Sequence, residues 1–185
     1  MLKSVRNIIC HIALIPPTEI KKEISNFKAL AHQKFGDNLQ YTSPSHITLI
    51  PPFRVNNEEL ILITKKATNI LKKNYQPIET IITGFYHYNN KTIILEINKN
   101  KNLEFLFNEL MHITSTITYD SNYRFNPYIP IAKSSEDIDL FLKASEYFGH
   151  LSYSKGFVSN SVGIFSYENE SWKLNKEIIL GNVFV

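Results

Sequence analysis

The chain has 185 residues, of which 43% are hydrophobic and 20% are charged, and its formal net charge is +3. This composition is typical of a globular protein with one continuous core, and it excludes disordered and fibrous chains. No apolar run approaches the roughly 18 residues that a transmembrane helix requires, and the N-terminal segment has no small-residue cleavage site. We therefore expect neither a membrane span nor a signal peptide.

Cysteine usage and charge narrow the class of protein further. Cys10 is the only cysteine, which excludes an intrachain disulfide and a cysteine-built zinc site and favours a cytoplasmic location. Neither a metal-ligand spacing nor a glycine-rich phosphate loop is found. We expect a monomer without metal or other cofactor, whose small positive charge is compatible with a nucleotide or RNA partner.

The first half of the chain alternates strands and helices. Residues 7–15 read as a buried strand, and apolar residues then recur at helical spacing from Pro17 to Gly36. A strand around His46 and a helix over 57–73 follow. Two further strands, at 77–85 and 91–98, are separated by a turn at Tyr88-Asn89-Asn90.

The second half begins with a helix near Asn102 and a short strand-like segment at 126–132. Ser134-Ser135-Glu136-Asp137 resembles a capping box that opens a helix ending near Gly149. Two strands, at 157–167 and 172–180, close the chain. This order predicts an α+β fold in a single domain over residues 1–185. We expect two similar halves whose antiparallel sheets enclose a concave cleft, with the helices outside.

The segment His46-Ile47-Thr48-Leu49-Ile50-Pro51-Pro52-Phe53 is the most informative in the chain. Successive side chains of a strand point to opposite faces, so His46 and Thr48 share one face. A titratable imidazole beside a hydroxyl group on an apolar strand could bind a phosphate. Prolines on either side limit the strand, because proline cannot donate to a sheet ladder.

A second copy of this pattern lies earlier in the chain. His11-Ile12-Ala13-Leu14-Ile15-Pro16-Pro17 matches residues 46–52 at every position except Ala13, where Thr48 stands in the later copy. We interpret the repeat as two adjacent strands of one sheet. A functional role for His11 stays open, although Ala13 provides no hydroxyl group beside it.

The block from Ser43 to Arg54 resembles the first motif of the 2H phosphoesterase superfamily, in the branch of 2′-5′ RNA ligase-like proteins. The segment from Arg124 to Lys133 falls where the second motif is expected. The resemblance implies a bilobal α+β fold in which two His-x-Thr strands face each other across a cleft. It also implies metal-independent hydrolysis of cyclic phosphates or 2′-5′ linkages of RNA. One imidazole then acts as base and the other as acid, and the threonines bind phosphate oxygens.

The second motif of this chain reads Tyr128-Ile129-Pro130, so a tyrosine takes the histidine position and a proline the threonine position. A phenol with a pKa of about 10 can donate a proton but is a poor base at neutral pH. Proline has neither a hydroxyl group nor a backbone N–H. Losing one acid–base group typically lowers a rate by about 10²–10⁴-fold.

Three hypotheses about function remain. The chain is a 2H-type phosphoesterase of impaired activity, acting on a 2′,3′-cyclic phosphate or a 2′-5′ phosphodiester. Alternatively, it is a non-catalytic protein that binds a nucleotide or an RNA end through the first motif, or it keeps only an inherited groove. As an enzyme it would use His46 as general acid or base and Thr48 as phosphate clamp. Tyr128 either fills the vacated site or donates a hydrogen bond to the phosphate.

Cations and other histidines supply further candidates. Arg54 follows the first motif and Arg124 precedes the second, and a guanidinium binds phosphate well, although both could be solvated side chains at strand ends. Lys133 has the same two interpretations. His87, between two tyrosines, could help to stack a base or could simply cover the sheet. Any of the remaining candidates could replace the missing imidazole: His11, His87, His112 and His150.

Overall fold

The computed structural model describes residues 7–40, 43–115, 124–134 and 137–181. In these ranges the chain forms four helices and two antiparallel sheets. The helices are α1 (Thr18–Phe35), α2 (Asn57–Asn74), α3 (Lys101–Ile113) and α4 (Ile138–Gly149). The strands are β1 (Ile8–Ile15), β2 (Leu39–Gln40), β3 (Ile47–Val55), β4 (Ile78–Tyr88), β5 (Thr92–Ile97), β6 (Tyr128–Ser134), β7 (Lys155–Ser159), β8 (Ser161–Glu168) and β9 (Ser171–Ile179).

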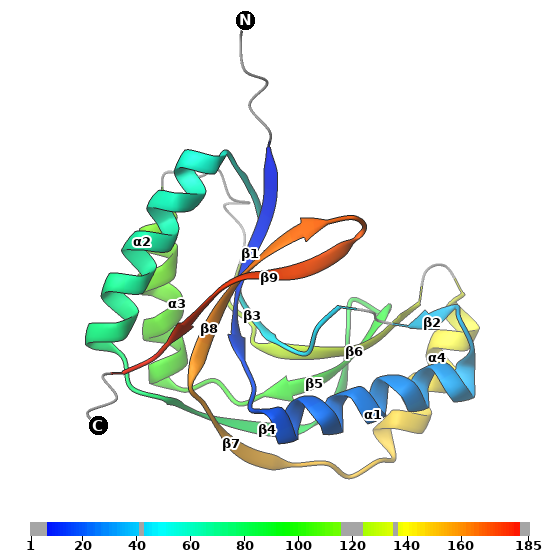
Figure 1. The fold of residues 1–185 in the computed structure, drawn as a ribbon. Coiled ribbons are helices and arrows are strands. Elements are labelled where there is room, and N and C mark those ends of the chain that lie inside the picture. Colours follow the sequence, from blue (N-terminus) through cyan, green and yellow to red (C-terminus); the bar gives the residue numbers. More distant parts are fainter. Residues whose placement is uncertain (1–6, 41–42, 116–123, 135–136, 182–185) are drawn as a thin grey trace, which may run out of the picture.

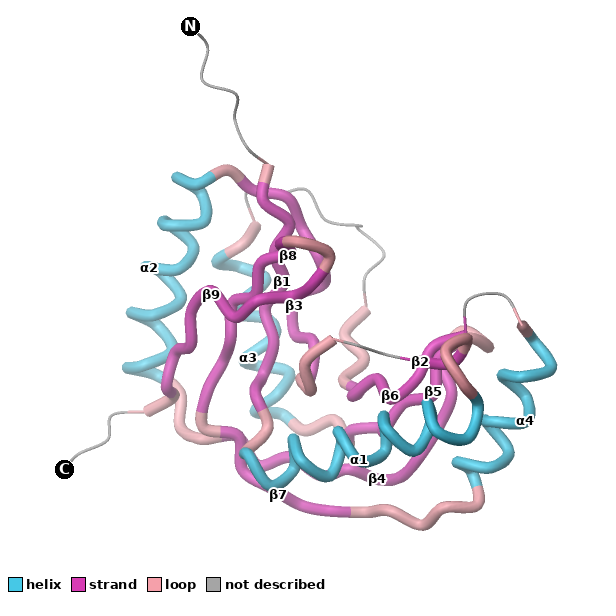
Figure 2. The backbone as a smooth tube through the Cα atoms, turned by 45° about the vertical axis from the view of Figure 1, so that its right-hand side comes forward, coloured by secondary structure: helices cyan, strands magenta, loops and turns pink. Residues whose placement is uncertain are grey.

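The strands divide into two sheets. The β1 sheet has the order β3-β1-β8-β9, and the β6 sheet has the order β2-β6-β5-β4-β7. Helices α2 and α3 pack against the β1 sheet, whereas α1 and α4 pack against the β6 sheet (Figure 1). In the rotated view of Figure 2 each sheet keeps its own pair of helices. This confirms the predicted α+β architecture, and strands β3 and β6 are in contact where the two halves meet.

Local sequence signals account for most helix ends. The Asn56 side chain accepts a hydrogen bond from the Glu59 backbone, and the Glu59 carboxylate accepts one from the Asn56 backbone, so α2 begins with a capping box. Helix α1 begins after Pro17 and ends before Gly36, whose φ of 75° favours glycine. The predicted start of α4 needs correction, because Asp137 is its N-cap.

Two parts of the sheet topology differ from the sequence-based expectation. The single strand predicted at 157–167 is two strands in different sheets, since β7 pairs with β4 and β8 pairs with β1. The chain passes between the sheets at Asn160, where no proline or glycine marks the break. The two-residue strand β2, which pairs with β6, was not predicted because it is too short to show an alternating pattern.

Alternation along β1 separates two apolar clusters. Cys10, Ile12 and Leu14 belong to the main core, whereas Ala13 and Ile15 pack with Phe165 on the other face of the β1 sheet. Trp172 packs against this smaller cluster. Because β8 and β9 form a tight hairpin, the start of β9 carries Trp172 to this face.

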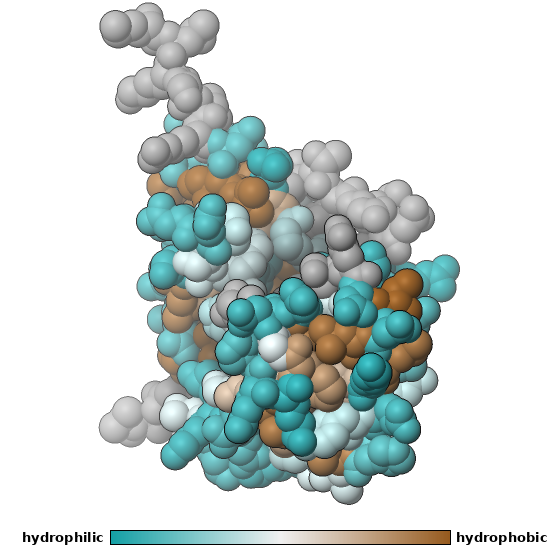
Figure 3. Space-filling view, turned by 90° about the vertical axis from the view of Figure 1, so that its right-hand side faces the viewer, coloured by the Kyte–Doolittle hydropathy of each residue, from teal (hydrophilic) through white to brown (hydrophobic). Residues whose placement is uncertain are grey.

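The face on the side of α4 is mostly polar (Figure 3). Figure 3 views the molecule from the side of α4, where hydrophilic side chains surround smaller apolar areas. Helix α4 exposes Ile138 and Leu142, which lie four residues apart and so share one helix face. None of the helices in the described part of the chain is both long enough and apolar enough to cross a membrane.

Candidate active site

A pocket of about 200 Å³ lies where the β1 sheet approaches β6. Strands β1 and β3 supply one wall, β6 and the residues before it supply the other, and Tyr88 and Trp172 come from β4 and β9. The lining residues are His11, His46, Thr48, Pro51, Pro52, Tyr88, Arg124, Asn126, Tyr128 and Trp172. Two segments that lie far apart in the sequence thus contribute the side chains that the motifs singled out.

The pocket brings together four of the six predicted site residues. His46, Thr48, Arg124 and Tyr128 line it, as expected for two motif strands that face each other. Tyr128 stacks on Tyr88, with ring centroids 5.2 Å apart. Together these rings give the β6 wall an aromatic surface, and Trp172 places a third ring at the pocket.

Arg54 and Lys133 do not line the pocket. Arg54 lies eight residues beyond His46, near the far end of β3, which at about 3.3 Å per residue allows a separation of up to roughly 26 Å. Lys133 lies five residues beyond Tyr128, near the end of β6, and is exposed. Of the three predicted phosphate-binding cations, Arg124 alone lines the pocket.

The tautomer of His46 is set by its local contact. Its Nδ1 lies 2.7 Å from the carbonyl oxygen of Pro44. A carbonyl oxygen can only accept, so Nδ1 carries the proton and the neutral ring keeps its lone pair on Nε2. Burial, helped by the charge of Lys28 and opposed by the hydrogen bond to Pro44, lowers the pKa of His46 to about 4. At neutral pH the ring is a base with its free lone pair on one defined atom.

Lys28 of α1 supports this arrangement and was not singled out by the sequence analysis. Its Nζ donates a hydrogen bond of 2.6 Å to the carbonyl oxygen of Ser43, in the segment that leads into His46. Burial lowers the pKa of Lys28 to about 8. In the sequence Lys28 is one of many helical lysines, and only the fold brings it near His46.

The repeated segments are adjacent strands, as predicted. In the register of β1 and β3, Ala13 pairs with Thr48, and the rings of His11 and His46 stack with centroids 4.6 Å apart and an interplanar angle of 26°. His11 and His46 lie on either side of the Ala13–Thr48 pair. The small methyl group of Ala13 leaves room for the two rings to meet.

His11 is enclosed by aromatic rings. Its ring stacks on Phe165 at 4.8 Å and meets the Trp172 ring edge-on at 4.2 Å, and only 3% of the residue is exposed. Its buried Nε2 has no hydrogen-bond partner among the described residues. Burial, with a smaller effect of His46, lowers the pKa of His11 to about 3, so this ring is neutral as well.

The other candidate histidines lie elsewhere. His87 stacks on Tyr86 with ring centroids 5.3 Å apart and also contacts Phe141 of α4, which agrees with a role in covering the sheet. His112 is on α3, and the backbone of His150 caps α4. None of these three lines the pocket, so His11 is the additional imidazole that the structure places beside His46.

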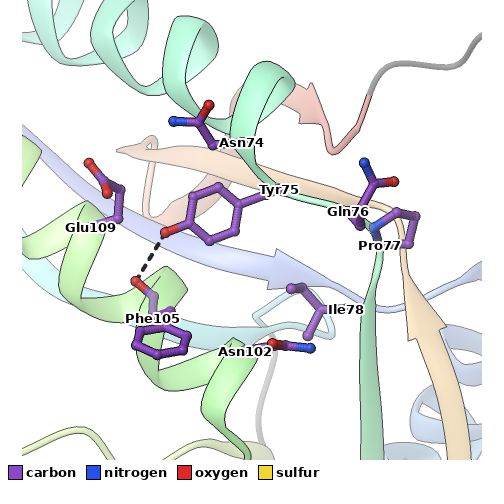
Figure 4. A pocket seen from close by; sticks show the side chains of 8 residues that line it. All are labelled: Asn74, Tyr75, Gln76, Pro77, Ile78, Asn102, Phe105 and Glu109. Atoms are coloured by element: carbon purple, nitrogen blue, oxygen red, sulfur yellow. Dashed lines mark hydrogen bonds between the residues drawn. The ribbon is translucent and has the colours of Figure 1, made fainter.

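A larger cavity of about 460 Å³ lies between the end of α2, the start of β4, and α3. Figure 4 shows the Tyr75 hydroxyl group directed at the backbone of Phe105, to whose carbonyl oxygen it donates a hydrogen bond of 3.2 Å. Burial and the nearby Glu109 raise the pKa of Tyr75. No histidine among the described residues lines this cavity, whereas His11 and His46 line the other pocket.

The described ranges contain no group of three or more His, Cys, Asp or Glu side chains that could hold a metal ion.

A comparison with known protein families decides the ancestry of the chain. The model of the 2′-5′ RNA ligase superfamily matches residues 16–170. The chain belongs to this superfamily.

Comparisons with individual proteins agree with this family assignment. A protein of Bacillus cytotoxicus, provisionally named a phosphoesterase, is 28% identical over 143 residues, which cover 75% of this chain and 80% of that protein. The structure of TT0787 from Thermus thermophilus has a TM-score of 0.71 at 12% identity, covering 94% of this chain and 99% of that one. Escherichia coli LigT complexed with 3′-AMP has a TM-score of 0.66 at 15% identity, covering 95% and 99%. The fold and the family predicted from the sequence are confirmed.

Proposed function

We propose that this chain binds the phosphate of a nucleotide or an RNA end at His46 and hydrolyses a 2′,3′-cyclic phosphate or a 2′-5′ phosphodiester without a metal. The observation that carries the proposal is the buried, neutral His46, whose tautomer is fixed and which shares a pocket with Thr48, Arg124 and Tyr128. Structures of E. coli LigT complexed with 3′-AMP and with phosphate support this choice of ligand.

Each side chain has a distinct role in the proposed reaction. As the attacking water oxygen bonds to phosphorus, Nε2 of His46 takes a proton from that water. The Thr48 hydroxyl group and the Arg124 guanidinium donate to the non-bridging phosphate oxygens, where negative charge increases. When the bond to the 2′ or 3′ oxygen breaks, Tyr128 gives that oxygen a proton and later recovers one from solvent.

The presence of Tyr128 and Pro130 on β6, in place of a histidine and a threonine, limits the rate of hydrolysis in this scheme. Tyr128 is a weaker acid than an imidazolium, and Pro130 offers no hydroxyl group to the phosphate. We therefore expect turnover below that of a site with two His-x-Thr motifs. Arg54 and Lys133 would contact only a ligand that extends well beyond the pocket.

The size of the pocket restricts the ligand. About 200 Å³ is less than the 300–1,000 Å³ typical of sites for drug-sized molecules, so it accommodates a phosphate and part of a sugar. A base would then lie at the mouth, against Tyr88, Tyr128 or Trp172, because aromatic rings stack on bases with little sequence preference.

The second candidate is a binding protein without catalysis. The weak acid at Tyr128 and the missing hydroxyl group at Pro130 favour it, because both reduce catalysis more than phosphate binding. In this case His46, Thr48 and Arg124 hold the phosphate, and the ligand leaves unchanged.

An activity assay separates the two candidates. The purified chain, in the presence of a chelator, is given nucleoside 2′,3′-cyclic phosphates and 2′-5′ dinucleotides beside the His46→Ala variant. His150→Gln is a matched control, since His150 is exposed and lies outside the pocket. Turnover that H46A alone abolishes supports the enzyme. Nucleotide binding that depends on His46 without turnover supports the binding protein. If the wild type shows neither turnover nor His46-dependent binding, both candidates are overturned.

A further inference from the structure

The charges around the pocket at His46 limit the charge of the ligand that it can hold. Among the described lining residues Arg124 is the only one with a permanent positive charge, and none of them is a carboxylate. Thr48, Tyr88 and Tyr128 carry hydroxyl groups, which are uncharged at neutral pH. The pocket therefore presents one positive charge to a bound phosphate.

The two histidines of the pocket add no second positive charge. Burial lowers the pKa of His46 to about 4 and that of His11 to about 3, so both rings are neutral near pH 7. Nδ1 of His46 donates to the carbonyl oxygen of Pro44 at 2.7 Å, which leaves Nε2 able only to accept a hydrogen bond. Lys28 of α1 donates to the backbone of Ser43, and its positive charge opposes protonation of His46. A phosphate in the pocket therefore meets a lone pair at Nε2.

We propose that this site selects phosphates with a single negative charge and takes a phosphodiester in preference to a fully ionised phosphomonoester. The inference rests on the phosphate site proposed above and specifies the class of ligand that it holds. Arg124 balances one negative charge, and a second would be desolvated without a partner in a pocket of about 200 Å³. The lone pair of His46 Nε2 also repels unprotonated phosphate oxygens.

Hydrogen bonding at Nε2 of His46 discriminates in the same direction. An acceptor requires a donor opposite it, and a phosphomonoester supplies one only while an oxygen keeps its proton. A phosphodiester has no such proton, but the attacking water of the proposed reaction donates to Nε2 in its place. A fully ionised monoester presents only acceptors, so it binds only when a proton is taken up from solvent with it.

The same charge balance helps the product to leave. Hydrolysis of a phosphodiester gives a phosphomonoester, whose second ionisation has a pKa of about 6. The proton that His46 takes from the attacking water passes to solvent, because the buried ring has a low pKa. The product then carries two negative charges against the single charge of Arg124. We therefore expect inhibition by the product to weaken as the pH rises from 6 to 8.

Two ligands that differ only in charge test the proposal. They are a 2′-deoxynucleoside 3′-phosphate and its methyl ester, and calorimetry with the full chain measures both Kd values between pH 5.5 and 8. The methyl ester carries one negative charge throughout, so its Kd should stay constant. The Kd of the monoester should rise by up to about tenfold per pH unit above about pH 6, because each molecule bound then takes up a proton. Similar Kd values at pH 5.5 control for the methyl group.

Three variants locate the selectivity in the pocket. His46→Gln replaces the imidazole by an amide whose nitrogen can donate to an ionised oxygen, so the ratio of the two Kd values at pH 8 should fall by about tenfold. Arg124→Gln should weaken the binding of both ligands. Lys133→Gln removes an exposed positive charge outside the pocket and is the matched control, with a ratio equal to that of the wild type.

The outcomes separate this inference from the proposed function. If neither ligand binds, or if binding does not depend on Arg124, the proposed phosphate site fails and the selectivity fails with it. If both ligands bind through Arg124 and the monoester binds as tightly as the methyl ester at pH 8, the selectivity alone is wrong. A ratio in H46Q equal to that of the wild type would also overturn it, since Nε2 would then not be the discriminating atom.

Discussion

Lys28 of α1 donates a hydrogen bond of 2.6 Å to the carbonyl oxygen of Ser43 and thereby joins a helix of one half to the segment that leads into the motif of the other. The next carbonyl, that of Pro44, fixes the tautomer of His46. The lysine thus affects His46 in two ways, through the shape of this segment and through its charge. Both effects can be measured.

Removing the charge of Lys28 should raise the pKa of His46. Lys28 lowers this pKa through its positive charge, so Lys28→Met should move the titration midpoint of His46 upward, whereas Lys28→Arg should keep it near that of the wild type. NMR titration of His46 in the three proteins measures the shift. A midpoint that is equal or lower in K28M would show that Lys28 acts on the backbone alone.

Stability should fall as the pH is lowered from about 6.5 towards 4. In the folded chain the pKa values of His11 and His46 are lowered from 6.5 to about 3 and about 4, so the unfolded chain binds more protons in this range. Each histidine then reduces the free energy of unfolding by up to about 1.4 kcal/mol per pH unit. Denaturant unfolding at several pH values measures the slope. It should be shallower in H11F and in the double variant H11F/H46F, and an unchanged slope in both would contradict the assigned pKa values.

Gly163 of β8 should not tolerate a side chain. A Cβ atom there would lie 2.6 Å from Phe165 Cε2 and 2.9 Å from the Cδ1 atoms of Ile15 and Leu174. We expect Gly163→Ala to lower the free energy of unfolding by about 1–3 kcal/mol through overpacking. Gly156→Ala on β7, where a Cβ atom meets nothing within 4 Å, is the matched control. Equal unfolding midpoints for the two variants would contradict the packing described beside the pocket.

Restoring the second motif should increase turnover. The double variant Tyr128→His/Pro130→Thr supplies an imidazole and a hydroxyl group on β6, opposite His46. We expect kcat to rise by about 10²-fold or more, because a general acid matched to neutral pH replaces a phenol. Steady-state kinetics on a nucleoside 2′,3′-cyclic phosphate measure the gain. Tyr128→Phe alone should lower kcat, and a kcat equal to that of the wild type in both variants would exclude proton transfer at this position.

The fold and half of the site were accessible from the sequence. Hydrophobic periodicity located α1, α2 and α3, whereas α4 was located by a capping pattern and Gly149. The two-residue period placed His46 and Thr48 on one face. Register and strand length were not accessible in this way. The stacking of His11 on His46 depends on the antiparallel pairing of Ala13 with Thr48. Arg54 was grouped with the site because it follows the motif closely in sequence, although an extended strand carries it far from the pocket.

Contacts between elements that lie far apart in the sequence were the second feature that the sequence did not predict. Trp172 reaches the pocket because the β8–β9 hairpin returns to the β1 sheet, and nothing near it in the sequence resembles a site. The split of residues 157–167 between two sheets has a similar cause. Strand-favouring residues on both sides of Asn160 predict one strand, while packing assigns β7 and β8 to different layers.

Hydrolysis of a nucleoside 2′,3′-cyclic phosphate, measured in the presence of a chelator by the wild type and by His46→Gln, tests the central claim most directly. The account predicts slow but measurable hydrolysis by the wild type and a loss of about 10²-fold or more in H46Q, because the substitution removes the lone pair of Nε2 that takes the proton from the attacking water. Equal rates for the two proteins would show that the pocket at His46 is not the place where the phosphate ester is cleaved.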